Sequence, residues 1–327
     1  MSIKIELQPS GIIFDASEDL SILDSALEKN INIEYSCKDG SCGTCKARLL
    51  QGSVNSVNSS TLSADEVADG YILTCCAKPK SDVVIQAEYY PQLSNIVKKS
   101  FPCKVHSLQF RCDEIAIVHL RIPPTIKFDY LPGQYIDLSL NGVRRSYSIA
   151  NMKGETIELH IRKVEDGIFS GFIFNELKEN ALLRAEGPLG TFFIRDDDRP
   201  IIFLAGGTGF APVKAMVEEL LSKNDSRCIY IYWGMASQQY FYSDVAEDWS
   251  KQYSHIEYIP VVSDIDDEWN GRTGFVHQAV LADFANLSAF NVYACGSPIM
   301  IEAARKDFVK SGLPEKQFFS DAFVQSN

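Results

Sequence analysis

The pattern of apolar and polar residues changes twice along the chain of 327 residues. In its first part, alternation predicts short strands at residues 3–7 and 12–14, and apolar positions three and four residues apart predict a helix at residues 22–29. A run of apolar residues at 83–87 predicts a closing strand. Residues 1–90 are therefore expected to form a small α+β domain.

The middle of the chain is dominated by short apolar runs with turn residues between them. Strands are predicted at residues 116–121, 134–138 and 157–162. Such spacing is typical of a small antiparallel β-barrel, which we expect at residues 101–197. A proline among polar residues at 91–100 indicates a linker in front of it.

From residue 198 to residue 327, predicted strands alternate with predicted helices. This alternation indicates a parallel, doubly wound α/β sheet, in which ligands bind at the carboxyl ends of the strands. The predicted strands are 201–204, 228–233, 256–262 and 291–294, and the predicted helices follow residue 211 and span 245–249, 276–281 and 299–310. The chain is thus expected to be multidomain.

Four cysteines of the first domain carry the most specific chemical signal. Cys37, Cys42 and Cys45 have the spacing C-x4-C-x2-C, and Cys75 follows after 29 intervening residues. This is the ligand spacing of a plant-type [2Fe-2S] cluster, which needs four thiolates around two irons. A zinc site would more often combine two CxxC knuckles or nearby histidines, and the first histidine is His106. The four cysteines are therefore predicted to hold a [2Fe-2S] cluster.

Three glycines come directly after the strand predicted at residues 201–204. Without side chains there, backbone N–H groups and the N-terminus of the next helix can approach a pyrophosphate. The turn is not the G-x-G-x-x-G fingerprint, but a sharp turn alone would not require three glycines with Thr and Pro. The candidate nucleotide-binding residues are Gly206, Gly207, Thr208, Gly209 and Pro212.

Composition limits the partners and the compartment. The net charge is −12, and residues 1–90 contain 13 acidic and 7 basic residues, so nucleic-acid binding is not expected. No apolar stretch is long enough to cross a bilayer, and the N-terminus lacks the apolar core of a signal peptide. The other five cysteines show no disulfide pattern, which favours a cytoplasmic protein without membrane contact. The acidic first domain fits either ordinary solubility or a docking surface for a basic partner.

The sequence Arg145-Ser146-Tyr147-Ser148 follows a predicted strand and an Asn-Gly turn, and it resembles the R-x-Y-S motif of the ferredoxin–NADP reductase superfamily. Alone, four such residues are a weak signal, but other motifs follow. The resemblance implies a β-grasp ferredoxin domain and a flavin bound on the barrel. It places the Arg145 guanidinium on the pyrophosphate, Tyr147 on the isoalloxazine ring and Ser148 at the N5 edge.

Three more segments of the barrel domain resemble the same superfamily. Residues 160–163 and 167–170 stand where it places adenosine and phosphate contacts, the second at the N-terminus of a helix. His160 itself is interpreted as a partly buried strand residue. The implied flavin-binding residues are Arg162, Gly167, Phe169 and Ser170. Residues 187–190, Gly-Pro-Leu-Gly, resemble the tight turn that closes the flavin domain.

Two segments of the third domain resemble the superfamily's site of hydride transfer. Cys295 and Gly296 follow a predicted strand and match the motif on the nicotinamide side. The terminal segment 318–324 matches the part in which an aromatic residue covers the flavin, a role that falls on Phe323. The hydride-transfer locus is thus predicted at Ser148, Cys295 and Phe323, with no residue assigned as a catalytic acid or base.

The resemblance also implies the cofactors. NADPH-dependent members place an arginine just after the strand that corresponds to residues 228–233; here Met235, Ala236, Gln238 and Gln239 are uncharged, which favours NADH. Electrons are expected to pass from NADH to FAD and then to the [2Fe-2S] cluster, because a flavin takes two electrons and gives them up singly. The sequence alone does not distinguish FAD from FMN as the bound flavin.

Two subfamilies resemble the whole chain: the reductases of Rieske or di-iron oxygenases, and the reductases of 3,6-dideoxyhexose biosynthesis. The phrases at residues 34–40, 141–151 and 319–324 are most similar to the latter. That similarity implies a pyridoxamine-phosphate-dependent CDP-6-deoxyhexose 3-dehydrase as the electron-accepting partner, with an oxygenase component as the alternative. A cluster-bearing sensor that does not turn over is a further hypothesis, which NADH turnover with ferricyanide would exclude.

Overall fold

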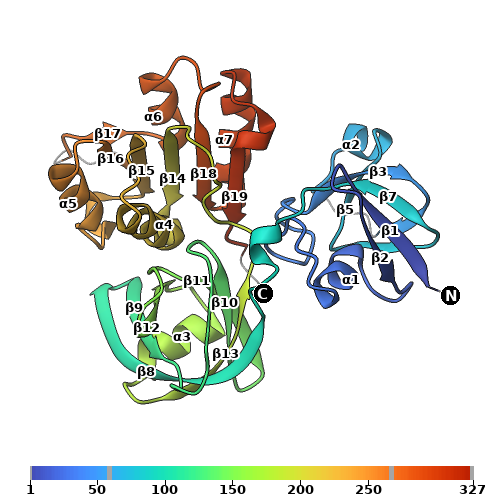
Figure 1. Cartoon of the computed structure of the whole chain (residues 1–327). Coiled ribbons are helices and arrows are strands. Elements are labelled where there is room, and N and C mark those ends of the chain that lie inside the picture. Colours follow the sequence, from blue (N-terminus) through green and yellow to red (C-terminus); the bar gives the residue numbers. More distant parts are fainter. Residues whose placement is uncertain (1, 57–60, 265–268, 325–327) are drawn as a thin grey trace. The chain divides into compact units, whose positions relative to one another are not determined.

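The computed structural model describes residues 2–56, 61–264 and 269–324, and the chain divides into two compact units (Figure 1). The first unit contains Met1–Val97 together with Leu189–Thr191, and the second contains Lys98–Pro188 together with Phe192–Asn327. Among the described residues, no helix combines the length and apolar character needed to span a bilayer.

A five-stranded mixed sheet forms the centre of the first unit. Ile3, Ile5 and Leu7 are buried along its first strand, while the residues between them face outward. Ser21 starts the first helix, because its hydroxyl accepts a hydrogen bond from the Asp24 N–H at 3.0 Å. In sheet order the strands are β2 (Ile12–Ala16), β1 (Ile3–Gln8), β7 (Val83–Gln86), β3 (Lys46–Gln51) and β5 (Tyr71–Leu73); β4 (Val54–Ser56) pairs with β6 (Ala77–Pro79), and the helices are α1 (Ile22–Glu28), α2 (Ala64–Ala68) and the 3₁₀ turn η1 (Pro91–Leu93).

A six-stranded antiparallel sheet of the second unit curls into a barrel. In sheet order its strands are β11 (Val143–Ser148), β10 (Tyr135–Leu140), β13 (Leu182–Leu189), β8 (Lys99–Cys112), β9 (Ile115–Arg121) and β12 (Thr156–Arg162), with the helix α3 (Ile168–Asn175) (Figure 1). Just after β11, Ile149 bridges to Leu159, and the Ala150 N–H donates to the Glu158 carbonyl at 2.8 Å. These contacts join the two edges of the sheet.

The interpretation of residues 187–190 as a tight turn is wrong for most of the segment. Gly187 to Leu189 continue the strand β13, and the backbone turns at Gly190, whose φ is +86°. Gly187 serves packing instead, since a Cβ there would lie 2.8 Å from the Ile136 side chain of β10. The absent N–H of Pro188 is tolerated because Gly187 forms the last pair with β8.

The rest of the second unit is a six-stranded parallel sheet with helices, as predicted. In sheet order the strands are β17 (Arg272–Thr273), β16 (Ile256–Val262), β15 (Ile229–Met235), β14 (Ile201–Gly206), β18 (Asn291–Gly296) and β19 (Phe318–Ala322); the helices are α4 (Phe210–Ser222), α5 (Val245–Gln252), α6 (Val276–Asp283) and α7 (Pro298–Lys310), with 3₁₀ turns η2 (Gly207–Gly209), η3 (Gln238–Tyr240) and η4 (Glu315–Gln317). The chain order reverses between β14 and β18, which is the position where such sheets bind ligands.

One apolar core joins the barrel to this sheet. Ile115 and Ile117 of β9 pack in the same cluster as Phe203 of β14 and Trp233 of β15. The barrel also has a core of its own, around Leu138 and residues such as Leu159. The barrel and the parallel sheet of the second unit are therefore packed directly on each other.

Candidate functional site

The four predicted cluster ligands lie together as two pairs of thiols. The Cys45 and Cys75 sulfurs are 3.2 Å apart, and the Cys42 N–H donates to the Cys37 sulfur at 3.4 Å. The loop between them turns sharply, with φ of +84° at Gly40, where a side chain would be strained. Two pairs of thiols match the two irons of a [2Fe-2S] cluster, each of which needs two cysteine ligands.

In each thiol pair the shared hydrogen bond makes one thiol more acidic and its partner less acidic, so that it raises the pKa of Cys37 and of Cys75. A hydrogen bond from Cys37 lowers the pKa of the Cys42 thiol to about 6, and a hydrogen bond with Cys75 lowers the pKa of Cys45. Across the described residues, no three His, Cys, Asp or Glu side chains gather as ligands of a single ion. The residues present fit a two-iron cluster, with sulfur donors and a backbone N–H already directed at one sulfur.

Two neighbouring arginines on β11 have different surroundings. Arg144 forms ion pairs with Asp137 and with Glu186, the second at 3.0 Å. Its guanidinium therefore already donates to two carboxylates of the barrel. Arg145 is half-buried and donates to the Arg144 carbonyl at 2.8 Å. Of the two, Arg145 has more donors left for a phosphate; its role at the flavin stays a prediction.

The structure brings β11 next to the N-terminus of α3. The Tyr147 and Phe169 rings are 5.9 Å apart. Phe169 is buried in the barrel core, so only its backbone N–H can serve a ligand. The Ser170 hydroxyl is held by Val164 and Gly167, and a Cβ at Gly167 would lie 2.5 Å from it. Gly167 thus needs to be glycine to let the chain enter the helix.

The other flavin-site candidates remain on the surface of the barrel. Arg162 is exposed at the end of β12, with Glu114 3.4 Å from its guanidinium. The Ser146 hydroxyl donates to Asp137. Exposure and a weak partner leave Arg162 able to meet an anionic group, whereas the Ser146 side chain already has a carboxylate partner.

The glycine-rich turn is packed closely against the carboxyl end of β18. A Cβ at Gly209 would lie 2.2 Å from the Cys295 carbonyl oxygen, and one at Gly206 would lie 2.7 Å from the Met300 sulfur. The Trp233 indole N–H donates to the Gly207 carbonyl at 2.9 Å. Contacts with the neighbouring backbone therefore restrict the shape of the turn. The helix α4 starts immediately after it, and Thr208 and Pro212 are buried.

Ser148, Cys295 and Phe323 are linked through Asp321, which contacts Ser148 of the barrel, pairs with Cys295 in the parallel sheet and lies two residues before Phe323. The Phe323 N–H donates to the Gly296 carbonyl at 2.8 Å, which fixes the terminal segment beside the end of β18. Burial, and to a lesser extent Asp321, raises the pKa of the Cys295 thiol well above its ordinary value. Cys295 is therefore a neutral thiol at physiological pH, with no nucleophilic role.

Asp321 is a site residue that the sequence analysis missed. It is buried on β19, with its carboxylate 3.4 Å from the Ser148 hydroxyl. On the sequence it is only an acidic residue in a mostly apolar segment, two positions before Phe323, and its partner lies far away along the chain. It orients the Ser148 hydroxyl at the predicted hydride-transfer locus.

Three family models match successive parts of the chain. They describe a 2Fe-2S iron-sulfur cluster binding domain at residues 5–80, an oxidoreductase FAD-binding domain at 102–194 and an oxidoreductase NAD-binding domain at 203–306. The predicted cofactors and fold class are thereby confirmed. The three matches lie inside the domains predicted from the sequence, whose limits stay a prediction.

Full-length relatives decide the family. The chain is 60% identical, over all of both chains, to the CDP-6-deoxy-L-threo-D-glycero-4-hexulose-3-dehydrase reductase of Yersinia pestis, and 33% identical to the phenol hydroxylase P5 protein of Acinetobacter pittii, over all of this chain and 96% of that one. The chain belongs to the ferredoxin–NADP reductase family. It is an electron-transfer oxidoreductase with [2Fe-2S], FAD and NAD domains. The crystal structure of the Amycolatopsis cytochrome P450 reductase GcoB is similar over 99% of both chains, with a TM-score of 0.80 and 27% identity.

Proposed function

We propose that this reductase passes electrons from NADH to a pyridoxamine-phosphate-dependent CDP-6-deoxyhexose 3-dehydrase, the activity of a CDP-6-deoxy-Δ3,4-glucoseen reductase. The observation that supports it most is the 60% identity with the Yersinia protein, whose name describes the reductase of a CDP-6-deoxyhexulose 3-dehydrase, against 33% for the phenol hydroxylase component. A cytoplasmic location is part of the proposal.

The three candidate sites divide the work among the domains. Cys37, Cys42, Cys45 and Cys75 would hold the cluster, Arg145 and the start of α3 would hold the flavin phosphates, and the turn at 206–209 would hold the nicotinamide nucleotide. Bound FAD supplies the change from two-electron to one-electron transfer. Since each domain is already assigned to one cofactor, the hexose is expected to bind to the partner.

Reconstitution with the dehydrase tests the proposal. With NADH and a CDP-4-keto-6-deoxyhexose, this protein alone should form no sugar product, and with the dehydrase it should form the 3,6-dideoxy-4-ketohexose, measured by chromatography. The acidic first domain is the expected contact surface, so the coupled rate should fall as salt is raised from about 0.05 to 0.5 M, where charges are screened. Direct reduction of ferricyanide by NADH should change less and serves as the control.

The reductase of an oxygenase is the second candidate function, supported by relatives such as the terephthalate 1,2-dioxygenase reductase component of Comamonas, at 33% identity. Electron transfer to an oxygenase component without any transfer to the dehydrase would establish this alternative. Sugar product without a partner would contradict both candidates.

A preference for NADH is a separate prediction. Ala236 is exposed directly after β15, and the Asp264 N–H donates to its carbonyl at 2.9 Å, which places an acidic residue beside the position expected for a 2′-phosphate. Ala236→Arg should raise kcat/KM for NADPH relative to NADH by no more than about 1 to 3 kcal/mol, which is roughly 5- to 150-fold, for one added charged hydrogen bond. Steady-state kinetics with both nucleotides measures the ratio, and a wild-type preference for NADPH would contradict the assignment.

A further inference from the structure

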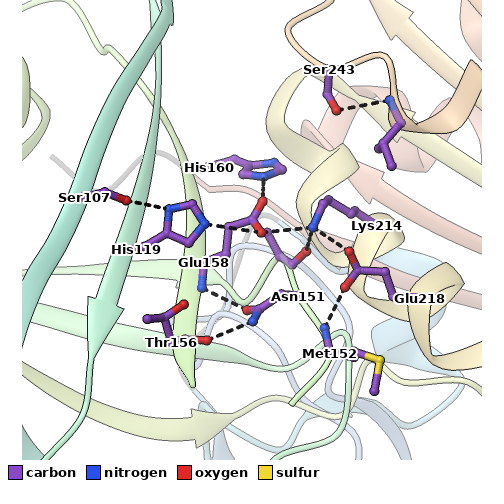
Figure 2. Close-up of polar contacts among 12 residues, drawn as sticks. Ser107, His119, Asn151, Met152, Thr156, Glu158, His160, Lys214, Glu218 and Ser243 are labelled. Carbon is purple, nitrogen blue, oxygen red and sulfur yellow. Dashed lines mark hydrogen bonds and ion pairs between the residues drawn. The ribbon is translucent and has the colours of Figure 1, made fainter. Parts of the chain in front are cut away.

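The carboxylate of Glu158, whose side chain is 12% exposed, lies at the centre of a polar cluster between the barrel and the parallel sheet (Figure 2). One Glu158 oxygen is 3.0 Å from the Lys214 ammonium, and the other is 2.7 Å from Nε2 of His160. The His119 ring is 3.7 Å away, and its other nitrogen is 3.1 Å from the Ser107 hydroxyl. Glu158 and His160 belong to β12 of the barrel, whereas Lys214 belongs to α4 of the nucleotide domain.

Lys214 has all three of its donors engaged. Its ammonium donates to Glu158, to Glu218 at 2.7 Å and to the Ala150 carbonyl at 3.2 Å, and its side chain is only 13% exposed. Glu218 in turn accepts from the Met152 N–H at 2.9 Å. Two of these acceptors, Glu158 and Ala150, are on the barrel, so one side chain ties both layers together.

The charges in the cluster are fixed by its surroundings. Burial alone would raise the pKa of the Glu158 carboxyl, but hydrogen bonds from His119 and His160 together with the Lys214 charge outweigh it and hold that pKa well below its usual range. Burial lowers the pKa of His160, which is therefore neutral. Since a carboxylate only accepts, the His160 proton is on Nε2, and Nδ1 accepts from the Tyr242 hydroxyl at 2.9 Å.

From Tyr242 the contacts continue to the glycine-rich turn. The Tyr242 ring is 5.0 Å from the Trp233 ring, which stacks on Phe210 at 4.0 Å and donates from its indole N–H to the Gly207 carbonyl. Lys214 is connected to the same turn only along α4, since it lies one helical turn, about 6 Å, beyond the first residue of that helix. The polar cluster is thus connected to the candidate nucleotide site by two routes, one through Tyr242 and Trp233 and one through α4.

On the barrel side the cluster holds the segment that carries Ser148. The Ala150 N–H donates to the Glu158 carbonyl at 2.8 Å while its own carbonyl accepts from Lys214. Ala150 is two residues, about 7 Å of extended chain, beyond Ser148. The same few side chains therefore fix the strand beside the predicted flavin and the turn beside the predicted nucleotide.

We propose that Glu158, His160 and Lys214 are positioning residues that align the barrel with the nucleotide domain for hydride transfer. The proposal rests on the candidate sites described above. Buried ion pairs add little net stability, because desolvation offsets their attraction, whereas they do define one arrangement of the parts that they join. Hydride transfer depends on that arrangement, since the reacting atoms must stay within about 3.5 Å and an error of 1 Å costs about 100-fold in rate.

The test uses Lys214→Met in the full-length holoprotein, with FAD and cluster contents checked first. Anaerobic stopped-flow with NADH gives the limiting rate of flavin reduction and, from its concentration dependence, the nucleotide Kd. We expect the limiting rate to fall by about 10- to 100-fold, and the long-wavelength absorbance of the stacked nicotinamide–flavin pair to weaken, while Kd changes by less than about threefold. Lys214→Arg, which keeps the charge, should restore most of the rate.

Lys223→Met is the matched control on the same helix. Lys223 is the C-terminal cap residue of α4 and, like Lys214, pairs with a glutamate four positions away, Glu219 at 2.7 Å, but it is 66% exposed and touches nothing on the barrel in the described contacts. Its limiting rate should equal that of the wild type. A wild-type rate and absorbance in Lys214→Met would overturn the proposal, even if that variant melted at a lower temperature.

Tyr242→Phe keeps the test decisive if Lys214→Met does not fold. It removes one hydroxyl from the cluster and should lower the limiting rate by at least about threefold; an unchanged rate would overturn the proposal. A wild-type protein whose flavin is not reduced by NADH at all would instead contradict the proposed function, which separates the two failures.

Discussion

Replacing Cys75 with serine should abolish the paramagnetic [2Fe-2S] signal of the reduced protein. The Cys75 sulfur lies 3.2 Å from that of Cys45, so the two thiols form one of the two ligand pairs, and the loss of one thiolate leaves an iron with three ligands. Electron paramagnetic resonance and iron analysis measure the loss. Reduction of ferricyanide by NADH should survive, because the flavin and nucleotide sites do not depend on this cysteine.

Cys76→Ser is the matched control, because Cys76 is the next residue and its sulfur is 3.6 Å from that of Cys75. Thr74 holds the chain so that Cys75, the next residue, lies beside Cys45. The Thr74 N–H and hydroxyl donate to the Cys45 carbonyl at 3.0 and 3.2 Å. The cluster signal should persist in Cys76→Ser. A lost signal in this variant together with a normal one in Cys75→Ser would show that the ligand assignment is wrong.

The features that sequence predicted well are those that depend on nearby residues. The cluster loop follows from the spacing of Cys37, Cys42 and Cys45, because three ligands on one short loop allow few arrangements. The strands β14, β15 and β18 were predicted because a parallel sheet buried on both faces leaves continuous apolar runs. The glycine-rich turn was identified because it joins such a strand directly to a helix.

Elements without such a local pattern were missed. The longest strand, β8, alternates clearly only in its first half, where Phe101, Cys103 and Val105 are buried; its second half is mostly exposed. The short strands around the cluster loop, such as β5 and β6, have only three residues each. Their apolar signal is too brief to distinguish from a loop.

Contacts between distant segments could not be predicted from pattern at all. On the sequence, Glu158 is an ordinary polar residue of an alternating strand and Lys214 an ordinary helical lysine 56 positions later. Only the packing of two domains brings them together as an ion pair with little exposure to solvent. Asp321 was missed for the same reason, since its partner Ser148 is 173 residues away.

Gly209→Ala should nearly eliminate flavin reduction by NADH. The added methyl would lie 2.2 Å from the Cys295 carbonyl oxygen and 2.6 Å from its carbon, so the glycine-rich turn must move away from the end of β18. That displacement separates the candidate nucleotide site from Cys295 and Phe323, which define the predicted hydride-transfer locus. We expect a fall of at least about 100-fold in the limiting rate, since a shift of about 1 Å has this effect.

Chemical reduction distinguishes a displaced turn from a damaged flavin site. Dithionite should reduce the flavin and the cluster of Gly209→Ala as in the wild type, because neither route passes through the turn. Gly154→Ala is the control: the nearest atoms to a Cβ there are 3.7 and 3.8 Å away, and its φ lies outside the left-handed range, so its limiting rate with NADH should be unchanged. A wild-type rate in Gly209→Ala would mean that the nucleotide does not depend on this turn.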